Sequence, residues 1–301
     1  MNAMQRYLAE EVGVDYADGI ITRREALRRL GLLGIAGAAA TTLLAACGSN
    51  DDTKPAPPAQ PTSADPSKPA GPAPLATQAV TFSGPQGRTL QGAWAAAASP
   101  KGSVLVIHEN RGLNDHIRSV AGRLAASGYS ALAIDLLSEE GGTGKYTDPA
   151  QATAALNAAP PERFVADMKA GVGELQRRVA GRKTAAIGFC FGGGMVWSLL
   201  AAGEPRLAAA APFYGPLPTG ADLAGSKGAA VLAIYAEQDT RVNATRDAAK
   251  AAMDKAGLTH EVVTYPNANH AFFNDTGARY VPAAANAAYQ KVLDWFGQHL
   301  G

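Results

Sequence analysis

Residues 184–194 read TAAIGFCFGGG, an apolar run that leads into a cysteine, a phenylalanine and three glycines. The apolar part predicts a buried strand and the part after Cys190 predicts a helix, so the cysteine stands at a tight turn. Glycines at 188 and 192 leave room for the strand and the helix to approach closely. This context is typical of a nucleophile elbow, and the helix N-terminus favours a thiolate there. A buried, inert cysteine beside a glycine turn is the alternative.

Strands and helices alternate on both sides of this turn, from about residue 79 to the end of the chain. We expect strands at 79–82, 90–96, 103–108, 129–134, 184–188, 207–213, 229–235 and 260–265, and helices at 114–127, 162–179, 192–202, 245–256 and 281–300. The first two strands predict a hairpin, and segment 136–160 predicts a flap with a short helix. The alternation predicts an α/β fold, with a mostly parallel central sheet and helices on both faces.

Chemistry in such sheets gathers at the carboxyl ends of the strands, so the residues that follow each strand matter most. Asp239 follows the strand 229–235, and His270 follows the strand 260–265. The order cysteine, aspartate, histidine is the order of a nucleophile, acid and base in α/β-hydrolases. Singly, a loop aspartate is usually a turn former and a loop histidine is usually solvated. All three at strand ends, in this order, favour a catalytic triad.

These motifs resemble those of the dienelactone hydrolase family, which has the α/β-hydrolase fold. The similarity extends from about 79 to 301 and rests on GFCFGG around Cys190, EQD at Asp239, NHAFF at His270 and HENRGLN at 108–114. It implies a carboxylic ester or lactone hydrolase that works through a Cys-His-Asp triad and a thioester acyl-enzyme. A small-molecule ester or lactone is then the expected partner.

The resemblance also implies roles for three residues near the nucleophile. Family members carry a glutamate directly after the strand that here ends at His108, and Glu109 occupies that position. This carboxylate would contact the resting thiol of Cys190 and move away when substrate binds. The backbone amides of Asn110 and Phe191 would form the oxyanion hole. A surface ion-pair residue is the alternative reading of Glu109.

One departure from the family pattern concerns the substrate. Members that cleave dienelactones bind a substrate carboxylate with arginines, one of them shortly after the catalytic histidine. The first arginine after His270 is Arg279, and segment 136–160 has no clear counterpart of the second. Arg111 offers a positive charge by another route. The expected substrate is therefore an ester or lactone that need not be a dienelactone.

The first 47 residues predict an export signal. Arg23 and Arg24, with Arg28 after them, precede an apolar run at 30–46, and this order resembles a twin-arginine signal, although Ala26 replaces its usual phenylalanine. The run ends in the sequence LAAC, which resembles a lipobox with Cys47 as the lipidated residue. We therefore expect export to the cell envelope or periplasm and a membrane tether. An uncleaved anchor or a buried alanine-rich helix is the alternative.

Residues 48–78 predict a linker, because proline recurs among Ala, Ser, Thr and Lys with no apolar period. Repeated proline favours an extended polyproline spacer, although plain disorder is an equal alternative. The remaining residues, 79–301, form the expected catalytic domain.

The composition and the absence of certain motifs exclude several other classes of protein. With 27 Lys+Arg and 26 Asp+Glu the net charge is +1, so a nucleic-acid partner is not expected. Two cysteines cannot form a disulfide scaffold, and the five histidines lack metal-ligand spacing. No phosphate-binding or dinucleotide-binding glycine motif is present, so we expect neither a metal nor a cofactor. The remaining rivals are a non-catalytic envelope lipoprotein that uses the fold for binding and a thiol-dependent redox protein.

Overall fold

An eight-stranded sheet forms the centre of the computed structural model, which describes residues 3–35, 37–47 and 69–301. The strands lie in the order β1-β2-β4-β3-β5-β6-β7-β8. The pairs β1–β2 and β2–β4 are antiparallel, and every pair from β4 to β8 is parallel. The strands are β1 (Gln78–Ser83), β2 (Thr89–Ala95), β3 (Gly102–Ile107), β4 (Tyr129–Asp135), β5 (Thr184–Phe189), β6 (Leu207–Phe213), β7 (Ala230–Ala236) and β8 (His260–Tyr265).

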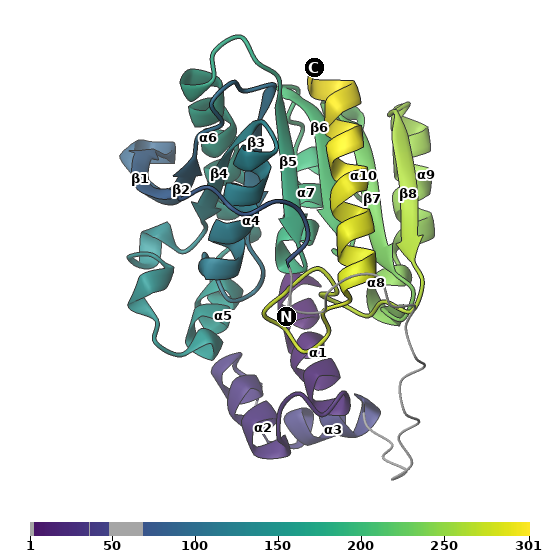
Figure 1. Ribbon diagram of the computed structural model, residues 1–301. Coiled ribbons are helices and arrows are strands. Elements are labelled where there is room, and N and C mark those ends of the chain that lie inside the picture. Colours follow the sequence, from purple (N-terminus) through teal and green to yellow (C-terminus); the bar gives the residue numbers. More distant parts are fainter. Residues whose placement is uncertain (1–2, 36, 48–68) are drawn as a thin grey trace.

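Helices cover both faces of the sheet, as the alternation predicts (Figure 1). They are α4 (Asp115–Ala126), α5 (Pro149–Ala158), α6 (Pro161–Arg178), α7 (Phe191–Ala201), α8 (Thr240–Asn243), α9 (Arg246–Ala256) and α10 (Pro282–Leu300). Helices α4 and α10 lie on one face, and α6, α7 and α9 lie on the other. Because both faces are covered, every residue of β3, β4, β5 and β7 is buried, and these strands are mostly apolar. The predicted α/β fold is confirmed.

The N-terminal segment forms three further helices, α1 (Ala3–Ala17), α2 (Arg23–Leu32) and α3 (Ala38–Cys47). They lie together beyond the end of the sheet that also carries α5, α8 and the loop before α10 (Figure 1). The apolar run 30–46 is divided between α2 and α3. Among the described helices, none combines the length and the apolar character needed to cross a bilayer.

Two parts of the N-terminal prediction fall outside the described residues. They are the segment 48–68 of the expected linker and the side chain of Cys47, whose backbone ends α3. Export, lipidation and the division of the chain into signal, linker and domain therefore stay predictions.

Candidate active site

Cys190 occupies a strained turn between β5 and α7. Its backbone has φ 57° and ψ −118°, a conformation that residues with a side chain rarely adopt outside functional sites. A Cβ atom at Gly188 would lie 2.2 Å from the carbonyl oxygen of Gly192, and one at Gly192 would lie 2.4 Å from the carbonyl oxygen of Ile107. Only glycine fits at either position. The strand, the turn and the helix that the sequence predicts are all present.

His270 and Asp239 meet at the ends of the neighbouring strands. Asp239 follows β7 and caps α8, because its Oδ1 accepts a hydrogen bond from the backbone amide of Val242 at 3.2 Å. Its Oδ2 lies 2.5 Å from Nδ1 of His270, which stands in the loop after β8. Both side chains are buried. The carboxylate therefore orients the imidazole through Nδ1 and leaves Nε2 as the ring nitrogen for other contacts.

Helix α1 brings two residues to this pair that the sequence analysis did not include. The Tyr7 hydroxyl lies 3.3 Å from Sγ of Cys190 and 3.4 Å from Nε2 of His270. A carboxylate oxygen of Glu11 lies 3.5 Å from the same Nε2. A Glu11 oxygen, Sγ of Cys190 and a ring nitrogen of His270 all lie within 4.8 Å of one another. Cys190 and His270 therefore face one common space, although they are 80 residues apart in the sequence.

This group of atoms has the composition of a three-ligand metal site. The carboxylate of Glu11, however, already forms an ion pair with the guanidinium of Arg241. The arrangement is satisfied by protein groups alone, and the absence of a metal stays a prediction.

The charges at the site are strongly coupled. Burial lowers the pKa of His270, but Glu11, Asp239 and Cys190 together outweigh it and hold this pKa well above the usual value. Burial raises the pKa of Glu11, yet His270, Arg241 and nearby Arg279 lower it to about 2. Glu11 is therefore ionised at neutral pH. Burial, and then the neighbouring Cys190, raise the pKa of Tyr7, so its hydroxyl keeps its proton.

Glu109 lies on the wall of the same cavity as Cys190, which has a volume of about 80 Å³. Its Oε2 accepts a hydrogen bond from Nδ2 of Asn274 at 2.6 Å, and its Oε1 is buried without a hydrogen-bond partner. The expected contact with the resting thiol is not formed, because the hydrogen-bond partner of Cys190 is Tyr7. Glu109 is buried rather than a surface residue.

The two amides expected for the oxyanion hole flank the nucleophile. Asn110 follows β3 and lines the cavity with Cys190, and Phe191 is the first residue of α7. Within the described part of the chain, neither backbone amide donates a hydrogen bond to another protein group. The oxyanion hole itself stays a prediction.

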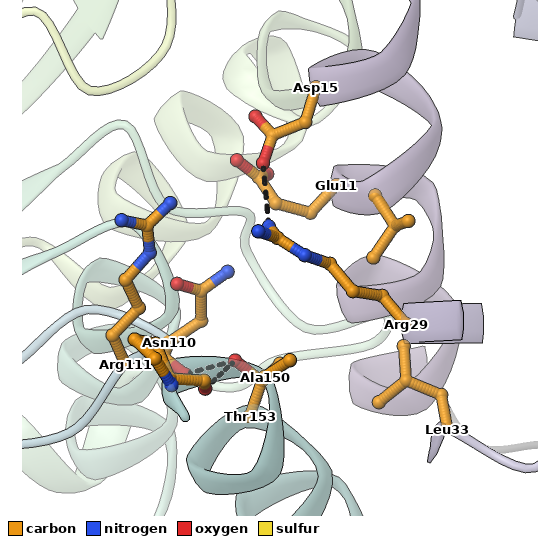
Figure 2. Close-up of a pocket in the computed structure, with 10 residues that line it drawn as sticks. Glu11, Asp15, Arg29, Leu33, Asn110, Arg111, Ala150 and Thr153 are labelled. Carbon is orange, nitrogen blue, oxygen red and sulfur yellow. Dashed lines mark hydrogen bonds and ion pairs between the residues drawn. The ribbon is translucent and has the colours of Figure 1, made fainter. Parts of the chain in front are cut away.

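The arginines that the sequence analysis singled out lie near α1. Figure 2 shows Glu11 and Asp15 of α1 on one side of a small pocket and Asn110 and Arg111 on the other. Arg111 is exposed. Arg279 is largely buried and forms ion pairs with Asp15 at 2.9 Å and with Asp18 at 2.7 Å. In this structure the guanidinium of Arg279 is therefore already paired with carboxylates of the chain itself.

A strained cysteine after the central strand, with a histidine–aspartate pair after the last strands of this sheet, defines the α/β-hydrolase class. The model of the dienelactone hydrolase family matches residues 90–300, and the chain therefore belongs to that family. The predicted membership of this family is confirmed.

Individual relatives agree with this assignment. A Salmonella typhi protein named "Putative carboxymethylenebutenolidase" is 35% identical over 227 residues, covering 68% of this chain and 82% of the relative. The crystal structure of the dienelactone hydrolase-like promiscuous phosphotriesterase P91 from metagenomic libraries is 28% identical. It has a TM-score of 0.64 and covers 75% of this chain and all of the other. A dienelactone hydrolase from Anabaena variabilis, 22% identical with a TM-score of 0.60, shows the same fold over 76% of this chain and all of that one.

One feature of the sequence could have pointed to Tyr7 and Glu11 as residues of the site. The segment before the paired arginines is acidic, with Glu10, Glu11 and Asp15, whereas the start of an export signal is normally basic. Helical spacing puts residues 7, 11 and 15 on one face.

Proposed function

We propose that this chain hydrolyses carboxylic ester or lactone bonds, with Cys190 as the nucleophile, His270 as the base and Asp239 as the residue that orients the base. The observation that carries the proposal is the 2.5 Å contact between Asp239 and Nδ1 of His270, with a ring nitrogen of His270 within 4.8 Å of the sulfur of Cys190. The name of the Salmonella typhi relative supports a lactone among the substrates.

The proposed reaction has two halves. Nε2 of His270 takes the thiol proton, and the thiolate attacks the carbonyl carbon of the ester. The amides of Asn110 and Phe191 hold the oxyanion, a contribution of about 3 kcal/mol for each well-placed donor. The tetrahedral intermediate then expels the alcohol, which receives the proton from His270. Water, deprotonated by the same Nε2, hydrolyses the thioester and restores the thiol.

Glu109 enters the proposal as a carboxylate that contacts the thiol of Cys190 when the cavity is otherwise empty. Its burial, its unpaired oxygen and its place on the wall beside Cys190 support this role. Asn274 holds the other oxygen and keeps the carboxylate within reach of the cavity.

We also propose that the enzyme works in the cell envelope, after export and lipidation at Cys47. Exposure of Arg23 and Arg24 on α2 supports this, because an export signal must be accessible. Cleavage before Cys47 would remove α1, α2 and nearly all of α3. The linker would then hold the domain away from the membrane.

The test uses the processed chain that begins at residue 47, with Cys47→Ser to leave one thiol. Turnover is measured on activated aryl esters and on lactones with and without a carboxylate. Cys190→Ala should abolish turnover and leave the unfolding temperature unchanged. Residual turnover at the parent rate would refute the assignment of Cys190. A non-catalytic binding module predicts no turnover by the parent either, and slow labelling of Cys190 by thiol reagents.

A further inference from the structure

We infer that helix α1 inhibits the enzyme in the uncleaved chain by occupying the catalytic site, and that the site opens only when this segment is removed. The inference rests on the proposed function. It assigns a partner to the active-site cleft: an acidic, tyrosine-bearing helix from the N-terminus of the same chain.

Tyr7 stands where a substrate would have to bind. Its hydroxyl is within hydrogen-bond distance of both Cys190 and His270, so it interrupts the direct approach of the base to the thiol. The side chain is buried in the main core together with its neighbour Leu8. About 80 Å³ of cavity remains beside Cys190, whereas small-molecule sites have roughly 300–1,000 Å³. An ester cannot enter while α1 is in place.

Acidic residues hold α1 to the catalytic domain. Glu11 pairs with Arg241, whose guanidinium also donates to the Tyr7 carbonyl oxygen at 2.9 Å and lies 4.2 Å from the centre of the Tyr7 ring. One turn further on, Asp15 pairs with Arg279, which also pairs with Asp18. Glu11 is ionised and nearly fully buried, so leaving it unpaired is costly. The acidic face of α1 matches the arginines that border the site.

The side of α1 that faces away from the catalytic site packs on helices α2 and α3. Ala9 and Val12 form an apolar cluster separate from the main core, with buried residues Ala26, Leu30, Ala40 and Leu44 of α2 and α3. Helix α2 is in turn tied to the catalytic domain by an ion pair between Arg28 and Asp148 at 2.7 Å. Helices α2 and α3 therefore pack against α1 and stabilise its position at the site.

This arrangement couples activity to processing. The paired arginines are exposed while α1 covers the site, so the covered form is the form that an export machinery can recognise. Cleavage before Cys47 breaks the covalent link that keeps α1 at a high effective concentration. The hydrolase would thus be inactive before export and active afterwards.

The first experiment uses the full chain with Cys47→Ser and a specific protease site inserted within residues 48–68. Turnover of an activated aryl ester is measured before cleavage and after the N-terminal fragment has been separated. If α1 leaves the site about 1% of the time, separation should raise kcat/KM about 100-fold. A synthetic peptide of residues 3–20, added to the freed domain, should inhibit competitively. Equal turnover before and after separation, or a loss on separation, would overturn the inference.

The second experiment keeps the full chain uncleaved and reverses one charge. Glu11→Arg places a cation against Arg241, and we expect turnover and thiol labelling of Cys190 to rise at least about tenfold. Glu10→Arg is the matched control, because Glu10 lies on the same helix and has no ion pair among the described residues. It should change both rates less than about twofold. Equal effects of the two variants would overturn the inference.

Thiol labelling separates this inference from the proposed function. If the freed domain turns over no ester but Cys190 is labelled faster after separation, α1 is a cover and the hydrolase assignment fails. If the freed domain and the full chain turn over esters and react with the reagent at equal rates, the hydrolase stands and the inference fails.

Discussion

Asp239→Asn in the processed chain tests the proposed base most directly, because the structure separates the two tasks of this side chain. Oδ1 caps α8 by accepting from Val242, and Oδ2 faces Nδ1 of His270. Asparagine keeps an oxygen for the cap and puts its NH₂ group opposite Nδ1. An NH₂ group can only donate, so Nδ1 must become an acceptor and the proton moves to Nε2. The nitrogen that faces the thiol then cannot accept its proton.

The expected magnitude follows from this change of tautomer. The same substitution in a serine-protease triad lowers kcat about 10⁴-fold, with the geometry intact. That factor corresponds to about 5 kcal/mol of transition-state stabilisation. We expect a loss of about 10³- to 10⁴-fold in kcat/KM for an aryl ester, because a thiol needs less help from a base than a hydroxyl does.

The assay compares kcat/KM and the unfolding temperature of the parent, of Asp239→Asn and of a control, Asp247→Asn. Asp247 is almost fully exposed on α9, so its substitution should alter neither quantity. Because asparagine keeps the hydrogen bond that caps α8, we expect the unfolding temperature of Asp239→Asn to be close to that of the parent as well. A loss of activity smaller than about tenfold, in a folded variant, would refute the role of Asp239.

Three further predictions concern stability, measured by urea unfolding of the full chain. Gly192→Ala should lower the free energy of unfolding by about 3 kcal/mol, because its Cβ would lie 2.4 Å from a carbonyl oxygen of β3. Gly144→Ala is the control, because the space around its Cβ is open, and it should change this free energy by less than about 1 kcal/mol. Equal effects of the two substitutions would contradict the packing argument. Glu11 has its pKa lowered from 4.5 to about 2, so its ionised form stabilises the folded chain above about pH 4.5 and this contribution is lost as the pH falls towards 2. The stability difference between the wild type and Glu11→Gln should shrink by about 3 kcal/mol over that range, and a constant difference would contradict the shift. Asn274→Ala removes the donor to the buried carboxylate of Glu109 and should lower the free energy of unfolding by about 1–3 kcal/mol. An unchanged free energy of unfolding would mean that water replaces the amide.

Much of the catalytic domain is predictable because its signals are local. Strand β5 and helix α7 follow from an apolar run, a cysteine and glycines at 188 and 192, and the structure gives the steric reason for each glycine. Residues that come directly after parallel strands must reach one edge of the sheet, so the approach of Asp239 to His270 also follows from the chain order.

The contacts of Glu109 were not predictable in the same way. Its position after β3 is readable from the sequence, but its hydrogen bond comes from Asn274, 165 residues further on. Which rotamer a buried carboxylate adopts depends on donors that arrive from distant elements.

The sequence by itself determines the class of fold, the turn that holds Cys190 and the positions of Asp239 and His270 on one sheet edge. These features depend on hydrophobic period, on glycine and on chain order, all of which are local or topological. Only the tertiary structure decides that α1 reaches the site and that Tyr7 and Glu11 lie against Cys190 and His270. Such contacts join distant residues, 183 positions apart for Tyr7 and Cys190, and their energy comes from burial and charge pairing that no local pattern records.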